Sequence, residues 1–120
     1  MPNKSFHRTD RISAHLRREL GTLVRDAVGE HGLPSVSVSD VEVTRDMAHA
    51  KVYFTALQSE RAAEALKGLK AVAPEIRFRL ARVVKMRHVP ELHFHYDDSV
   101  DRGERIDRLL GDLDQGDSAD

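Results

Sequence analysis

The chain has 120 residues, with 19 Lys or Arg against 20 Asp or Glu, and no cysteine. This length suits one domain with a modest core. The lack of cysteine excludes disulfides, thiolate metal sites and a thiol nucleophile. No apolar run approaches the roughly 18 residues of a membrane helix, and residues 1–11 lack the apolar core of a signal peptide, so we expect a cytoplasmic protein with no membrane partner. Charge is unevenly distributed: residues 61–90 hold eight Lys or Arg against two Glu, a net +6, and residues 91–120 hold three Arg against ten Asp or Glu, a net −7.

The N-terminal part of the chain predicts one long amphipathic helix. Apolar residues recur at intervals of three and four from residue 12 to residue 28, which is the period of a helix with one buried side. Gly29 or Gly32 can end this helix, because glycine readily adopts the left-handed conformation that follows many last helical turns. The first element is therefore expected to bury one side and to leave the other side to solvent.

The next part predicts a hairpin of two strands. Apolar and polar residues alternate over residues 36–43, but the alternation slips by one residue at Ser39 and Asp40. A bulge is the simplest explanation, since one extra residue moves every following side chain to the other face. Residues 45–49 read as the turn, and residues 50–56 alternate again as the second strand.

A second helix is expected to pass through a proline. Ser59 is the predicted N-cap, because a serine oxygen accepts from the free backbone donors of a first turn. The apolar stripe runs from Ala62 to Val84 at helical spacing and continues across Pro74. Proline removes one helical donor and clashes with the preceding turn, so we expect a kink or break at Val72-Ala73-Pro74, with both halves facing one core.

The C-terminal part predicts a third strand and a last helix. Residues 92–96 alternate apolar with polar, the period of a half-buried strand. Ser99 can cap a helix whose apolar residues lie between 106 and 113. The fold class is thus α+β, in the order α-β-β-α-kink-α-β with a three-stranded sheet and a C-terminal helix. We expect one domain over residues 1–111 and an acidic disordered tail over residues 112–120.

Basic residues around the proline favour a polyanionic partner. Phe78, Arg82 and Lys85 share the side opposite the apolar stripe, where an aromatic ring between two cations can stack on an unpaired base. The alternatives are a merely solvated basic face, and a Phe78 ring that packs under another segment. The residues predicted to bind RNA are Arg8, Arg11, Arg17, Arg18, Arg25, Lys67, Lys70, Arg77, Phe78, Arg79, Arg82, Lys85 and Arg87.

Histidines near the third strand raise the question of a metal site. His93 and His95 share one strand face with Asp97, and His88 lies just upstream. Zinc requires three or four ligands in a fixed geometry, whereas alternation with apolar residues already explains these histidines as the polar side of a sheet. We therefore expect no metal, no cofactor and no catalytic residue here, and we read residues 97–99 as the start of a helix.

Three stretches, taken together, resemble one family over nearly the whole chain. The element order resembles a type II KH domain, and the sequence resembles the bacterial ribosome-binding factor A family. The matching pieces are Arg8-x-x-Arg11-Ile12 with Leu16-Arg17-Arg18-Glu19-Leu20; Val41-x-Val43-Thr44-Arg45-Asp46-Met47-x-x-Ala50-x-Val52-Tyr53-Phe54; and Leu80 through Arg87-x-x-Pro90-Glu91-Leu92-x-Phe94-x-Tyr96-Asp97-Asp98-Ser99 with Gly103-x-x-Ile106-x-x-Leu109-Leu110.

The resemblance implies a ribosome biogenesis factor rather than an enzyme. It implies transient binding to the precursor of the small ribosomal subunit and its 16S ribosomal RNA, near the decoding region, during late maturation. It also implies help from an assembly GTPase, a monomeric state and a part in adaptation to cold. The alternative from another class is a module that contacts a ribosomal or translation protein, and a histidine-based metalloenzyme ranks last.

The chain departs from the family pattern at the kink. The resemblance implies an Ala-x-Gly kink between the two half-helices, where this chain has Val72-Ala73-Pro74. Glycine permits unusual dihedral angles, whereas proline bends a helix by deleting a donor. The kink should therefore persist, but a backbone contact to phosphate that needs a flexible glycine becomes doubtful. The GxxG loop of ordinary KH domains is also missing, so base reading in their manner is not expected.

Overall fold

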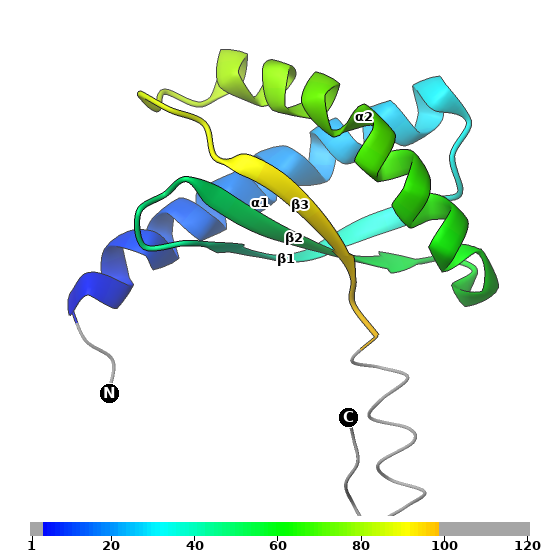
Figure 1. Ribbon diagram of the computed structural model, residues 1–120, viewed down its shortest axis with the longest axis horizontal. Coiled ribbons are helices and arrows are strands. Elements are labelled where there is room, and N and C mark those ends of the chain that lie inside the picture. The colour runs from blue at the N-terminus through cyan, green and yellow to red at the C-terminus, as the bar shows by residue number, and fades with distance from the viewer. Residues whose placement is uncertain (1–3, 99–120) are drawn as a thin grey trace, which may run out of the picture.

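The computed structural model describes residues 4–98, with side chains from Asp10 onward, as two helices on one face of a three-stranded sheet (Figure 1). The elements are α1 (Lys4–His31), β1 (Val36–Val43), β2 (His49–Ala56), a 3-10 turn η1 (Ser59–Arg61), α2 (Ala62–Val83) and β3 (Glu91–Tyr96). The sheet order is β1-β2-β3; β1 and β2 are antiparallel, and β2 and β3 are parallel. Helix α2 is the crossover that a parallel pair needs, and the predicted α+β order is confirmed.

Helix α1 buries one stripe and ends at a glycine. Leu16 and Leu20 are fully buried, and the stripe continues one turn later at Val24. The helix stops at His31, and Gly32 follows with a φ of 65°. The backbone N–H of Leu33 donates to the carbonyl of Val28 over 3.0 Å, which is the closing hydrogen bond of a Schellman motif. Of the two predicted terminators, Gly32 is therefore the one that ends α1.

The first strand carries the predicted bulge. The register between β1 and β2 shifts between Val38 and Asp40, so Ser39 is the extra residue. Its hydroxyl donates to the carboxylate of Asp97 over 2.7 Å, just after β3. The bulge thus joins the edge strand β1 to the end of β3, on the far side of β2.

The core lies between the sheet and the two helices. Ala50, Val52 and Phe54 of β2 are fully buried, and they alternate with residues that point to the other side of the sheet. Within residues 4–98 that other side carries no helix (Figure 1), and it is called the open face below. Residues of β2 and β3 on the open face are His49, Lys51, Tyr53, Thr55, Glu91, His93 and His95.

Helix α2 is one unbroken helix of 22 residues rather than two. Its axis changes direction partway along (Figure 1), so the expected kink is present without a break in the chain of helical residues. Leu69 before Pro74, and Ile76 and Leu80 after it, are all fully buried. Proline has no N–H to donate to the preceding turn, yet both halves of α2 face one core.

The start of α2 differs from the prediction. Ser59 is not an N-cap: it opens η1, and no side chain caps either η1 or α2. The chain enters α2 through the 3-10 turn η1, in which the backbone N–H of Arg61 donates to the carbonyl of Gln58 over 2.9 Å. Such 3-10 turns are common at helix starts because they pair backbone groups that a cap would otherwise satisfy.

Several predictions concern residues beyond the described range. The C-terminal helix capped by Ser99, the acidic tail over residues 112–120 and the domain boundary at residue 111 all lie outside residues 4–98. Within residues 4–98, none of the helices has both the length and the apolar character needed to cross a bilayer.

Pro74→Ala should stabilise the protein and keep the bend. The substitution restores a helical donor and removes the ring clash, so the free energy of unfolding should rise, by at most about 3 kcal/mol. Burial of Leu69, Ile76 and Leu80 on one core should hold the two halves at their present angle. Thermal unfolding measures the first effect, and a crystal structure of the variant measures the second. A straightened α2 in that structure would show that proline alone sets the bend.

Candidate nucleic-acid interface

An exposed aromatic ring on α2 is the centre of the candidate interface. Phe78 is 65% exposed, whereas most large apolar side chains of the described residues are buried. The guanidinium carbon of Arg82 lies 5.8 Å from the centroid of the Phe78 ring, within the usual range of a cation–π contact. In the described part of the chain the ring is thus not covered, and it presents a flat apolar surface beside a positive charge.

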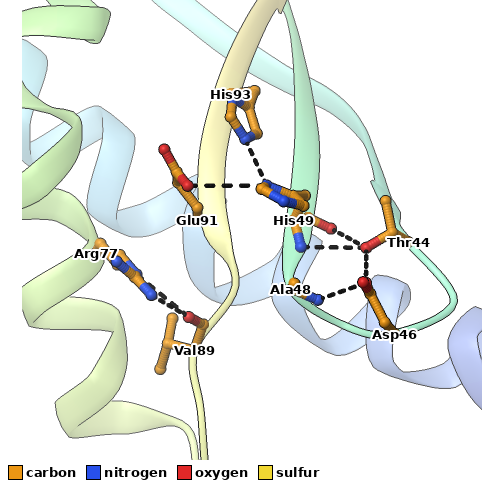
Figure 2. A network of polar contacts seen from close by, with 8 residues as sticks. All are labelled: Thr44, Asp46, Ala48, His49, Arg77, Val89, Glu91 and His93. Atoms are coloured by element: carbon orange, nitrogen blue, oxygen red, sulfur yellow. Dashed lines mark hydrogen bonds and ion pairs between the residues drawn. The ribbon is translucent and has the colours of Figure 1, made fainter.

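A shallow groove runs beside this ring. It has a volume of ≈ 450 Å³, with one wall from α2 after the proline and the other from the segment over residues 84–90. Arg77 fixes the distance between these walls, because its Nε and Nη2 donate to the carbonyl of Val89 over 3.2 and 2.7 Å (Figure 2). The residues that line the groove are Pro74, Arg77, Phe78, Ala81, Met86, Arg87, His88 and Val89.

One of the two cations predicted before the proline lines a different groove. Lys67 and Lys70 are exposed on α2 before the proline. Lys70 and Ala73 line a groove of ≈ 710 Å³ between α2 and β3, whose other wall includes Leu92 and His95. Of the predicted RNA-binding residues of α2, Lys70 thus lines one groove, and Arg77 and Phe78 line the other.

Arg79 is paired with carboxylates of the protein itself, although its side chain remains 34% exposed. Its Nη1 and Nη2 donate to the two carboxylate oxygens of Glu30 over 3.2 and 2.8 Å, and Nη2 lies 2.9 Å from Glu75. The hydrogen bond from Arg79 holds the pKa of Glu30 below its usual range, and the same bond raises the pKa of Arg79. His31 completes the network, with its Nε2 3.0 Å from Glu75. Arg79 thus joins the end of α1 to the middle of α2.

The arginines of α1 form a separate basic surface. Arg11, Arg18 and Arg25 repeat at seven-residue spacing and are exposed, as is Arg17 beside them. Nη2 of Arg18 lies 3.4 Å from Nδ1 of His15. Arg8 belongs to α1, but its side chain is outside the described range. The predicted stripe is therefore present and exposed from Arg11 onward, on a different helix from Phe78.

Three residues that line the groove were not predicted from the sequence to belong to a binding surface. Met86, His88 and Val89 line the groove beside Phe78, although they follow no helical or strand period. Their position depends on the way the chain leaves α2 and on the hydrogen bond from Arg77 to Val89. The only signal in the sequence was their place between a basic helix and a strand.

Comparison with known proteins identifies the family. The family model for ribosome-binding factor A matches residues 8–110. A ribosome-binding factor A from Xanthomonas euvesicatoria is 74% identical over 114 residues, which cover 95% of this chain and 88% of that protein. The chain therefore belongs to the ribosome-binding factor A family.

Solved structures agree with this assignment. The crystal structure of ribosome-binding factor A from Thermus thermophilus has a TM-score of 0.54 at 27% identity, covering 70% of this chain and 93% of that one. Coordinates of the Thermus thermophilus factor fitted into a cryo-EM map of a 30S–RbfA complex have a TM-score of 0.55 at 27% identity, covering 72% and 96%. The type II KH-like fold predicted from the sequence is thus the fold of this family.

Glu30→Gln should lower thermal stability slightly at neutral pH, and the difference from the wild type should vanish in acid. The folded protein lowers the pKa of Glu30, so the ion pair contributes above the ordinary glutamate pKa of about 4.3 and is lost as the pH falls below it. Melting temperatures across that pH range measure the effect. In an Arg79→Ala background, the same substitution should have almost no effect at any pH. An equal effect in both backgrounds would contradict the pairing.

Proposed function

We propose that this protein binds the precursor of the small ribosomal subunit transiently through its 16S ribosomal RNA, close to the decoding region, during late maturation. The observation that carries the proposal is the exposed Phe78 ring with Arg82 beside it, in a member of this family. An exposed aromatic ring can stack on an unpaired base, while neighbouring cations hold phosphates. A relative from Thermus thermophilus has been fitted into a 30S complex, which supports the same partner here.

The structure suggests how such binding would be divided among the cations. Arg82 lies over the Phe78 ring, and Arg87 lines the groove beside it. Lys85 is exposed too, but α2 ends at Val83, so Lys85 follows the helix and does not share the helical side predicted for it. Each of the three cations can meet a phosphate. Arg77 and Arg79 are already bonded to Val89 and Glu30, so they position the groove and the helix that carries it. Lys70 in the other groove, and the arginines of α1, extend the surface available to RNA.

A binding protein of this kind needs no catalytic group. A ligand that prefers one RNA conformation shifts the population toward it by its differential affinity. We infer that the protein acts in this way, as a cytoplasmic monomer that promotes RNA processing indirectly and leaves with help from an assembly GTPase. A part in adaptation to cold belongs to the same proposal, because stable wrong RNA pairings are harder to escape at low temperature.

One observation favours a protein partner instead. Val83, the last residue of α2, is half exposed, and exposed apolar surface also suits a protein interface. Salt dependence distinguishes the two partners. Phosphate contacts release counterions, so affinity for RNA should fall steeply with salt, whereas an apolar protein interface should respond weakly.

Arg82→Glu and Lys85→Glu should each weaken binding to immature small subunits without unfolding the protein. Both side chains are exposed, so stability should change by less than about 0.5 kcal/mol. Each reversal should also reduce the slope of log affinity against log salt by about one, since one phosphate contact is lost. Co-sedimentation with particles at several salt concentrations measures both.

The matched control is Arg45→Glu in the turn between β1 and β2. It makes the same change of charge at an exposed site outside both grooves. Its affinity should stay close to that of the wild type. Equal losses from Arg45→Glu and Arg82→Glu would mean that net charge, rather than the surface around Phe78, governs binding.

A further inference from the structure

Three potential metal ligands converge where β2 and β3 begin, on the open face of the sheet. Nδ1 of His49 lies 3.0 Å from Nε2 of His93 and 3.8 Å from a carboxylate oxygen of Glu91. One ligand atom from each of the three residues lies within 4.8 Å of the other two. Figure 2 shows the two imidazole rings and the carboxylate turned toward one another.

The parallel pairing of the strands brings these residues together. His49 is opposite Glu91 in the register, and His93 lies two residues further along β3 on the same face. The backbone N–H of Glu91 donates to the carbonyl of Ala48 over 2.9 Å, which fixes the first step of the register. The candidate ligands in the sequence were His88, His93, His95 and Asp97, without His49 or Glu91, because a periodic pattern does not reveal which residue of another strand lies opposite.

Hydrogen bonds on both sides hold the ends of the two strands in place. Before β2, the carboxylate of Asp46 accepts from the Thr44 hydroxyl over 2.7 Å and from the Ala48 N–H over 3.0 Å, and the Thr44 hydroxyl oxygen accepts from the His49 N–H over 3.1 Å (Figure 2). Before β3, Arg77 holds the carbonyl of Val89. The three ligand side chains therefore extend from fixed backbone.

We propose that His49, Glu91 and His93 form a binding site for Zn²⁺. Two imidazole nitrogens and one carboxylate oxygen are a donor set that zinc takes in many proteins, with water in the fourth position. In a tetrahedral zinc site, neighbouring ligand atoms are separated by about 3.3–3.6 Å, given bonds of about 2.0–2.2 Å. The two separations from His49, 3.0 and 3.8 Å, lie on either side of this range, and the ligand atoms of Glu91 and His93 are within 4.8 Å of each other. Side-chain rotations would therefore bring the three donors to tetrahedral spacing.

A second cluster of three potential metal ligands in the described residues is already occupied by an arginine. Glu30, His31 and Glu75 also offer three ligand atoms, but the guanidinium of Arg79 bonds to both carboxylates. Among the side chains described from Asp10 to Asp98, no lysine or arginine forms an ion pair with Glu91. Lys51 is opposite His93 in the register, but it is exposed, and solvent screens its charge.

A bound zinc ion would join β2 to β3 next to the segment over residues 84–90. That segment leads directly into Glu91 and forms one wall of the groove beside Phe78. An ion that binds the folded protein and not the unfolded chain raises the melting temperature in proportion to the logarithm of its concentration. Zinc should therefore stabilise the protein and restrict the motion of that wall, whether or not RNA is the partner.

The test is a zinc titration of the full chain after treatment with a chelator. Isothermal titration calorimetry should show one saturable site, with a higher melting temperature in ZnCl₂ than in MgCl₂, because Mg²⁺ prefers oxygen ligands. His49→Ala and His93→Ala should each weaken zinc binding at least about tenfold, since even changes outside the ligand set cost about 10- to 100-fold. NMR of the wild type should show zinc-induced shifts of the His49 and His93 rings.

The matched control is His95→Ala, on the same strand and the same face. Its ring lies beside Tyr53, with centroids 5.6 Å apart, and it is not one of the three ligands. Zinc affinity should be the same for His95→Ala as for the wild type. The proposal is overturned if the wild type shows no saturable site, or if the double variant His49→Ala/His93→Ala binds zinc as tightly as the wild type.

Discussion

One apolar stripe on α2, continuous across Pro74, determines which side chains of that helix reach solvent. Leu69, Ile76 and Leu80 are fully buried in the core shared with the sheet and α1. Because they fix the rotation of α2 on both sides of the proline, Phe78 has no place in the core. Its exposure therefore follows from packing elsewhere on the same helix, and so does its position on the α2 wall of the groove.

The fold was largely predictable because its periodic signals are strong and agree with one another. The slip in alternation at Ser39 and Asp40 predicted a bulge, and Gly29 or Gly32 was predicted to end α1, which Gly32 does. Both features have a local cause in backbone geometry. The prediction that Ser59 is an N-cap was wrong, because the free backbone N–H groups of a first turn can be satisfied in several ways, and a serine side chain is only one of them. A local sequence feature therefore predicts local structure well where only one backbone conformation suits that feature.

The candidate interface was only partly predictable, because contacts between distant segments decide which charges are free. Helical spacing placed Arg79 among the available cations, yet Glu30, 49 residues earlier, binds it. The facing pair of His49 and His93 likewise depends on the register of a parallel sheet. Exposure of Phe78 was left open by the sequence, since an aromatic residue opposite the apolar stripe can still be covered by another segment.

The most direct test of the central claim asks what the surface around Phe78 touches. The chain contains no cysteine, so Ala81→Cys provides a single thiol in the same groove for an azidophenacyl cross-linker. On immature small subunits, this probe should cross-link to 16S ribosomal RNA, whereas the same probe at Ser37→Cys, exposed on β1 on the open face, should not. Cross-links from Ala81→Cys to ribosomal proteins alone, or equal RNA cross-links from both positions, would contradict the account.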